Sequence, residues 1–167
     1  MKNFLINQYK SDLNLKIKHN YLIEQFSDYK EIFKDISKLI KSADYTLGVP
    51  VEKFEKLFSK IVNSKYSIGV GSGTDALFLS LKAYNIGHGD EVITTPFTYI
   101  ATIGAIATSG AKPVFVDVKY DCNIDEDKIE KKITSKTKAI MPVHWSGKIC
   151  NMKKIIKIAK KYNLKII

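Results

Sequence analysis

Arginine is absent from this sequence of 167 residues, and lysine supplies all 27 of its basic side chains. Base recognition and bidentate phosphate contacts favour arginine, because its planar guanidinium presents several donors in a fixed fork. The lysines are also unevenly spread: residues 67–118 hold two against four acidic residues, whereas residues 119–167 hold 13 against five. We interpret the formal charge of +10 as solvated helix surface and expect no nucleic-acid partner.

Cysteine is scarce as well, since Cys122 and Cys150 are the only two and form no closely spaced pair. Two cysteines are too few for a disulfide framework, which favours a reducing, cytoplasmic location. Long apolar runs are also missing. The most apolar stretch, residues 99–111, contains three hydroxyl residues and two glycines and is too short to span a bilayer. We expect neither a membrane segment nor a metal site.

The sequence does contain a regular alternation of strand and helix patterns after residue 66. Residues 113–118 and 138–143 are continuously apolar, which is typical of parallel strands covered by helices on both faces. The alternation predicts an α/β fold with a three-layer, mostly parallel sheet. Strands are expected at residues 67–70, 91–95, 113–118, 138–143 and 164–167, and helices at residues 74–84, 98–109, 125–133 and 152–162.

The first third of the chain has a different pattern. Residues 1–28 show no clean periodicity and are interpreted as a poorly specified leader. Residues 29–40 and 51–62 each carry apolar side chains at helical spacing, and Gly48 and Pro50 interrupt the pattern between them. A chain of this length forms one ordinary domain, which we place at residues 29–167.

The glycine-rich segment "GVGSGT", residues 69–74, stands between a strand pattern and a helical pattern. Bare backbone there exposes N–H groups and the positive end of a helix dipole, which suits an anion such as phosphate. Two nucleotide-binding motifs do not fit. A Walker A loop needs a lysine, which residues 66–81 lack, and a dinucleotide fingerprint needs glycine at the positions of Thr74 or Ala76. A tight turn without a ligand is the open alternative.

Aromatic residues follow the next strand pattern, in the segment "TTPFTYIAT". Phe97 and Tyr99 come at the carboxyl end of an expected parallel strand, where an aromatic face beside a phosphate-binding turn would hold a flat cofactor. For either aromatic residue taken alone, ordinary core packing is the alternative interpretation.

Several segments taken in order resemble a known family. These segments are "GSGTDALFLSLKA", "GDEVITTPFTYIATIGAI", "AKPVFVDV", "NID", "TKAIMPVHWSG" and "LKII". From about Tyr45 to Ile167 they resemble the N-terminal part of the DegT/DnrJ/EryC1/StrS aminotransferases. These are pyridoxal-phosphate (PLP) enzymes that aminate nucleotide-linked keto-sugars. The resemblance implies an incomplete large domain of the aspartate-aminotransferase type (PLP fold type I). It also implies a homodimer, a nucleotide-sugar substrate and an amino-acid amino donor.

The resemblance also assigns residues to a PLP site. Gly73, Thr74 and Asp75 fall where the family binds the cofactor phosphate, mostly through backbone N–H groups. Tyr99 falls where an aromatic residue stacks on the pyridine ring. His144, in "VHWSG", matches a segment near the cofactor, although a core histidine that donates to the backbone is an equal alternative. The lysine of "SGKICNM" departs from the family, which more often has an uncharged turn there.

PLP chemistry needs an aspartate at the pyridine nitrogen and a lysine for the Schiff base. In the family both follow the strand that matches "LKII", and none of the 27 lysines lies in a matching context. We therefore assign no catalytic residue and expect the sequence to be an amino-terminal fragment that is inactive alone. A non-catalytic partner subunit and a nucleotide-binding α/β module are the alternatives.

Overall fold

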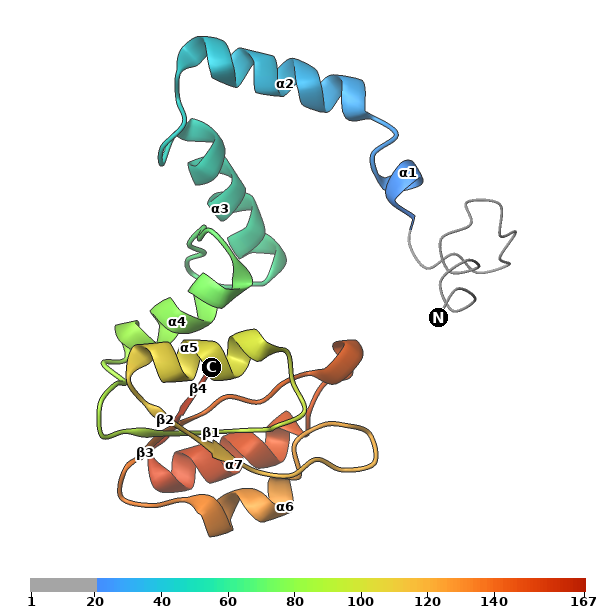
Figure 1. Ribbon diagram of the computed structural model, residues 1–167. Coiled ribbons are helices and arrows are strands. Elements are labelled where there is room, and N and C mark those ends of the chain that lie inside the picture. The colour runs from blue at the N-terminus through green and yellow to red at the C-terminus, as the bar shows by residue number, and fades with distance from the viewer. Residues whose placement is uncertain (1–20) are drawn as a thin grey trace, which may run out of the picture. The chain divides into compact units, whose positions relative to one another are not determined.

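The computed structural model describes residues 21–167, so most of the expected leader, residues 1–28, lies outside the described residues (Figure 1). The chain divides into two compact units, one that ends at Ser67 and one that runs from Ile68 to Ile167. The described residues of the first unit form three helices, and the second unit holds every strand of the described chain.

The helices of the first unit are α1 (Leu22–Gln25), α2 (Tyr29–Ser42) and α3 (Val49–Ile61), and the last two confirm the expected pair. Helix α2 ends at Ala43, whose left-handed backbone (φ +54°) closes the last turn. A carboxylate caps α3, because the N–H of Val49 donates to Asp44 Oδ2 at 3.1 Å. No side chain of these three helices is buried among the described residues.

The second unit contains a four-stranded sheet made of β1 (Glu91–Thr94), β2 (Lys112–Phe115), β3 (Thr137–Ile140) and β4 (Lys165–Ile166). The strand order is β2-β1-β3-β4, and every pair is parallel. Pro113 is tolerated in the edge strand β2. The N–H groups of Lys112 and Val116 donate to the carbonyls of Asp90, just before β1, and Thr94, so the pleat turns the nitrogen of Pro113 outward.

Helices cover both faces of this sheet (Figure 1). Helices α4 (Gly73–Ala83) and α5 (Ile100–Ser109) bury Leu81 and Ile106 in the same cluster as Val92. On the other face α6 (Glu126–Ile129) and α7 (Met152–Tyr162) pack around Ile93, and the 3-10 turn η1 (Glu130–Lys132) follows α6 directly. Because Val92 and Ile93 are adjacent in β1, the alternation of a strand directs them to opposite layers. This arrangement confirms the expected three-layer parallel α/β fold.

The expected strand at residues 67–70 is wrong. None of the four strands pairs with this segment, and the side chain of Ile68 is 80% exposed. A strand requires a neighbour that accepts and donates its backbone hydrogen bonds, and the described residues provide none at this position. The apolar pattern alone does not reveal whether such a neighbour exists.

All four strands are shorter than expected. β1 ends at Thr94, ahead of Pro96, so β2 and β3 lose their common partner and end at Phe115 and Ile140. Val118 instead forms an isolated antiparallel bridge with Ile124. The helix expected at residues 125–133 has only the four residues of α6 before it tightens into the 3-10 turn.

Two adjacent isoleucines of α7 provide a test of this packing. Ile155 is fully buried, whereas Ile156 is 40% exposed. We expect Ile155→Ala to lower the free energy of unfolding by about 2–5 kcal/mol, because it removes buried methylene groups and leaves a cavity. Ile156→Ala should change it by less than about 1 kcal/mol. Denaturant unfolding of both variants measures the difference, and equal losses would contradict the assigned face of α7.

Candidate functional site

The loops after β1, β2 and β3 emerge at one edge of the sheet, because parallel strands have their carboxyl ends together. Side-chain hydrogen bonds connect two of these loops at their origin. The buried hydroxyl of Thr94, the last residue of β1, donates to the carbonyl of Met141 just after β3 at 2.9 Å. This edge carries Phe97, Tyr99 and His144.

The first turn of α4 faces the same edge. Residues 84–90 connect the end of α4 to the beginning of β1, so α4 runs opposite to β1 and begins at the carboxyl edge. Helix α5 follows β1 directly and therefore also begins there, and the two helices are in contact (Figure 1). The fold thus brings Gly73, Thr74 and Asp75 to the edge that carries Tyr99.

A side-chain cap shapes this first turn. Ser72 Oγ accepts the N–H of Asp75 at 3.1 Å and donates to Asp75 Oδ2 at 3.0 Å. The N–H groups of Gly73 and Thr74 precede any intrahelical acceptor, and no hydrogen bond to them is present within the described part of the chain. Apart from its neighbours in the chain and in the helix backbone, a Cβ built on Gly73 would meet no atom within 4 Å, so the space beside Gly73 is open.

The two aromatic residues after β1 have different surroundings. The ring of Phe97 packs against Trp145, with ring centroids 4.2 Å apart and planes tilted by 39°. Tyr99 is the N-cap residue of α5 and is 74% exposed. No aromatic partner of Tyr99 is found between residues 21 and 167, so its ring face is accessible.

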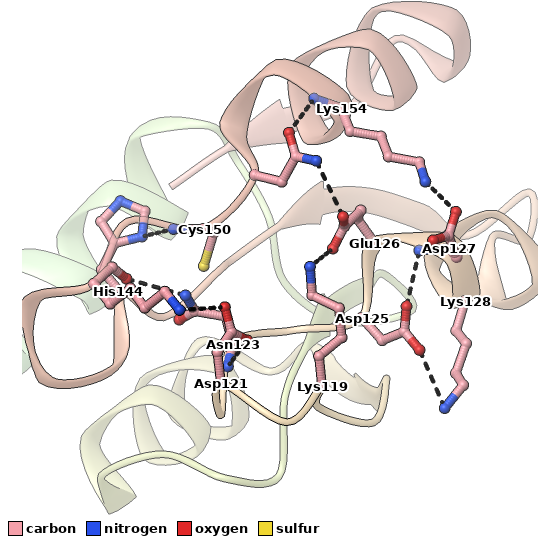
Figure 2. A network of polar contacts seen from close by, with 12 residues as sticks. Lys119, Asp121, Asn123, Asp125, Glu126, Asp127, Lys128, His144, Cys150 and Lys154 are labelled. Atoms are coloured by element: carbon pink, nitrogen blue, oxygen red, sulfur yellow. Dashed lines mark hydrogen bonds and ion pairs between the residues drawn. The ribbon is translucent and has the colours of Figure 1, made fainter.

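His144 lies after β3 and is exposed, and Figure 2 shows its ring beside Cys150. Its Nδ1 accepts the backbone N–H of Cys150 at 3.3 Å. The alternative of a core histidine that donates to the backbone is therefore wrong, because the side chain is exposed and acts as an acceptor. In the neutral ring the proton then resides on Nε2, which can donate toward the solvent side.

Lys148, the departure from the family pattern, forms an ion pair with Asp121 at 3.2 Å. The backbone N–H of Asn123 and then the Lys148 ammonium hold the pKa of Asp121 below its ordinary value. Trp145 and the buried Asn123 join this group, since Asn123 Oδ1 accepts the N–H of Trp145 at 3.1 Å. The sequence pattern does not predict either residue, and their only signal is their place in the "NID" and "VHWSG" segments.

A buried carboxylate lies beneath this edge. Glu126 forms an ion pair with Lys119 at 2.8 Å and accepts a hydrogen bond from Asn151 Nδ2 at 3.1 Å (Figure 2). Burial raises the pKa of Glu126, but the hydrogen bonds from Lys119 and Asn151 outweigh it and hold that pKa below 4.5. The same contact with Glu126 raises the pKa of Lys119.

Histidine, cysteine and acidic side chains form no group of three with the geometry of a metal site among residues 21–167. None of the helices in this range has both the length and the apolar character needed to cross a membrane.

Residues 27–167 match the family model of the DegT/DnrJ/EryC1/StrS aminotransferases. The chain belongs to this family. A dTDP-3-amino-3,6-dideoxy-alpha-D-galactopyranose transaminase of Aneurinibacillus thermoaerophilus is 52% identical over 139 residues, which cover 83% of this chain and 38% of that protein. The GDP-perosamine synthase of Caulobacter vibrioides is 44% identical over 123 residues, covering 73% of this chain and 33% of that protein.

A solved relative shares the fold. The crystal structure of NtdA from Bacillus subtilis with bound cofactor PMP superposes with a TM-score of 0.83 at 34% identity, covering 92% of this chain and 37% of that one. The chain therefore has part of the fold-type-I large domain that the resemblance implied. It spans well under half the length of these DegT/DnrJ/EryC1/StrS relatives.

Glu126 yields a prediction about pH. A carboxylate whose pKa is lowered by folding stabilises the protein above its unfolded pKa, and this contribution disappears as the pH falls through the folded pKa. At pH 7 we expect Glu126→Gln to lower the free energy of unfolding by about 1–3 kcal/mol, because Lys119 loses its partner. The difference from the wild type should shrink below pH 4.5.

The matched control is Asp127→Asn, which breaks the exposed ion pair with Lys154. It should change the stability little, since exposed pairs are well solvated. Denaturant unfolding across the pH range measures both variants. A Glu126→Gln effect that is constant with pH would contradict the assigned ionisation.

Proposed function

We propose that residues 29–167 form the N-terminal portion of the large domain of a PLP-dependent aminotransferase, which transfers an amino group to a nucleotide-linked keto-sugar. Membership of the family and the printed activities of the relatives, on dTDP- and GDP-linked sugars, support this proposal. The observation that carries it is the meeting of an open helix N-terminus and an accessible aromatic ring at one edge of the sheet.

The first turn of α4 fits the cofactor phosphate. The N–H groups of Gly73 and Thr74 need an acceptor, the helix dipole favours a negative charge, and the open space at Gly73 admits one. The N–H of Asp75 also points along this turn, but it already donates to Ser72. In the proposal Gly73 and Thr74 carry most of the phosphate contact, and Asp75 shares its N–H between Ser72 and the phosphate.

The remaining proposed contacts orient the cofactor ring. Tyr99 offers an exposed ring face for stacking, while His144 presents Nε2–H as a donor because Nδ1 is engaged by the Cys150 N–H. When bound, PLP supplies the electron sink for moving a proton at the carbon that bears the amino group. The described residues of this chain bind and orient the cofactor, and none of them is assigned a proton-transfer role.

The proposal extends to the partners that the family resemblance implies. These are an amino-acid donor, a nucleotide-sugar acceptor and a second subunit in a cytoplasmic homodimer. The sugar products would serve the biosynthesis of surface polysaccharides or secondary metabolites. A relative named spore coat polysaccharide biosynthesis protein SpsC, from Bacillus subtilis, is 41% identical and supports this class of product.

Amino transfer itself tests the function. We expect a protein that contains this chain, incubated with PLP and glutamate, to convert a nucleotide-linked keto-sugar into the amino sugar, detected by mass spectrometry. The visible absorbance of bound PLP should change when glutamate is added. A protein that binds PLP but shows neither change would contradict the proposed reaction while leaving the cofactor site intact.

Two glycine-to-alanine variants, compared with each other, test the phosphate contact. Gly73→Ala adds a methyl group that meets no protein atom, but this group enters the space proposed for the phosphate. We expect stability to be kept and the affinity for PLP to fall by about tenfold. Gly104→Ala in α5, where an added Cβ also meets nothing within 4 Å, is the control and should keep the affinity. Equal PLP affinity in both variants, measured by titration, would place the phosphate elsewhere.

A further inference from the structure

The side chain of Asn123 holds both ends of the turn that follows β3. It is 1% exposed, and its Oδ1 accepts the N–H of Trp145 at 3.1 Å while its Nδ2 donates to the carbonyl of Lys148 at 3.1 Å. Its own backbone is fixed as well, since its N–H donates to Asp121 Oδ1 and its carbonyl accepts from Lys119. Figure 2 shows Asn123 between the residue 119–121 segment and the loop of His144.

The turn that Asn123 bridges has an unfavourable backbone. Ser146 has φ +50° and Gly147 has φ +82°, so two successive residues lie in the left-handed region. For a serine this conformation costs free energy and persists only where the surroundings impose it. Hydrogen bonds from one rigid side chain to the residues on either side of Ser146 and Gly147 impose it here.

The restraint continues from Trp145 to the aromatic residues after β1. The Trp145 ring packs on Phe97, and the N–H of Phe97 donates to the buried hydroxyl of Thr95 at 3.2 Å. Phe97 is two residues before Tyr99, the N-cap of α5. A displacement of the Trp145 ring is therefore transmitted to the backbone of Tyr99 through one ring contact, with Phe97, and two peptide units.

We propose that Asn123 is a positioning residue for the cofactor site, acting through Trp145 and Phe97 to set the place of Tyr99. This inference rests on the proposed function, because Tyr99 is taken as the residue that stacks on the cofactor. Asn123 touches neither cofactor nor substrate in this proposal. Its buried amide matters to the fold because an apolar side chain of the same size would leave the N–H of Trp145 and the carbonyl of Lys148 without these partners.

A double-mutant cycle tests whether Asn123 acts on the cofactor site through Trp145. Asn123→Ala removes both hydrogen bonds, Trp145→Leu removes the ring, and the double variant removes both. We expect each single variant to weaken PLP binding by about tenfold, and the double variant to be no weaker than the single ones. The visible circular dichroism of bound PLP should change in the same variants, because it reports the orientation of the ring. Additive losses, or wild-type affinity in Asn123→Ala, would overturn the proposal.

A control separates positioning from stability. Thr137 is also buried, and its Oγ1 accepts the N–H of Thr134 at 2.9 Å at the opposite end of β3. Thr137→Val should lower stability but leave the affinity and the circular dichroism of bound PLP unchanged. Equal weakening of PLP binding in Thr137→Val would show that lost stability alone explains the effect.

A second variant is available if Asn123→Ala does not fold. Asn123→Asp keeps the acceptor for Trp145 and removes only the donor to Lys148. This variant should alter the dichroism less than Trp145→Leu does, and an equal or larger change would also overturn the proposal.

Fluorescence distinguishes a failure of this inference from a failure of the proposed function. Trp145 is the only tryptophan of the sequence, and subtracting the emission of Trp145→Phe isolates its signal in a longer protein. We expect Asn123→Ala to shift this emission even without PLP, because the ring leaves Phe97. If the wild type does not bind PLP, the proposed function fails. The emission then decides whether Asn123 positions Trp145, and an unchanged emission overturns that role.

Discussion

The parallel pairing of β1 with both β2 and β3 is the constraint on which the rest of this unit depends. Parallel strands place their carboxyl ends together, so the segments after Thr94, Phe115 and Ile140 have to meet at one edge. β1 is the shared partner, and its end at Thr94 also ends its neighbours. The hydroxyl of Thr94 then bonds to the loop after β3, so the same residue that terminates the strand joins two of the three loops.

Burial separates the residues that shape this edge from those that are available to a ligand. Three polar side chains at this edge are buried and form hydrogen bonds with other groups of the protein, namely those of Thr94, Thr95 and Asn123. Tyr99 and His144 are exposed. His144 Nδ1 accepts the Cys150 N–H, and within residues 21–167 the other ring nitrogen has no hydrogen bond. An edge built in this way has rigid supports below and accessible groups above, which is the arrangement that a bound planar cofactor requires.

The sequence predicts this architecture well where the signal is local. Continuous apolar runs correctly indicate β2 and β3, and the glycine-rich segment correctly precedes α4. The expected strand at residues 67–70 is wrong because pairing depends on a neighbour far away in the chain. Asn123 is missed for a related reason: its importance comes from two bonds to residues more than 20 positions later, and an asparagine in a turn looks the same with or without them. The cofactor contacts that the sequence assigns to the site residues stay predictions.

The absence of arginine bears on how this fold could hold a phosphate. Several lysines of the second unit pair with acidic side chains: Lys119 meets Glu126, Lys154 meets Asp127 and Lys161 meets Glu130. Residues 67–118, which contain the glycine-rich turn, hold more acidic residues than lysines. An anion at α4 therefore depends on backbone N–H groups and the helix dipole rather than on cationic side chains of this segment. Such binding requires a backbone that a ligand can approach closely, and the open space at Gly73 meets that requirement.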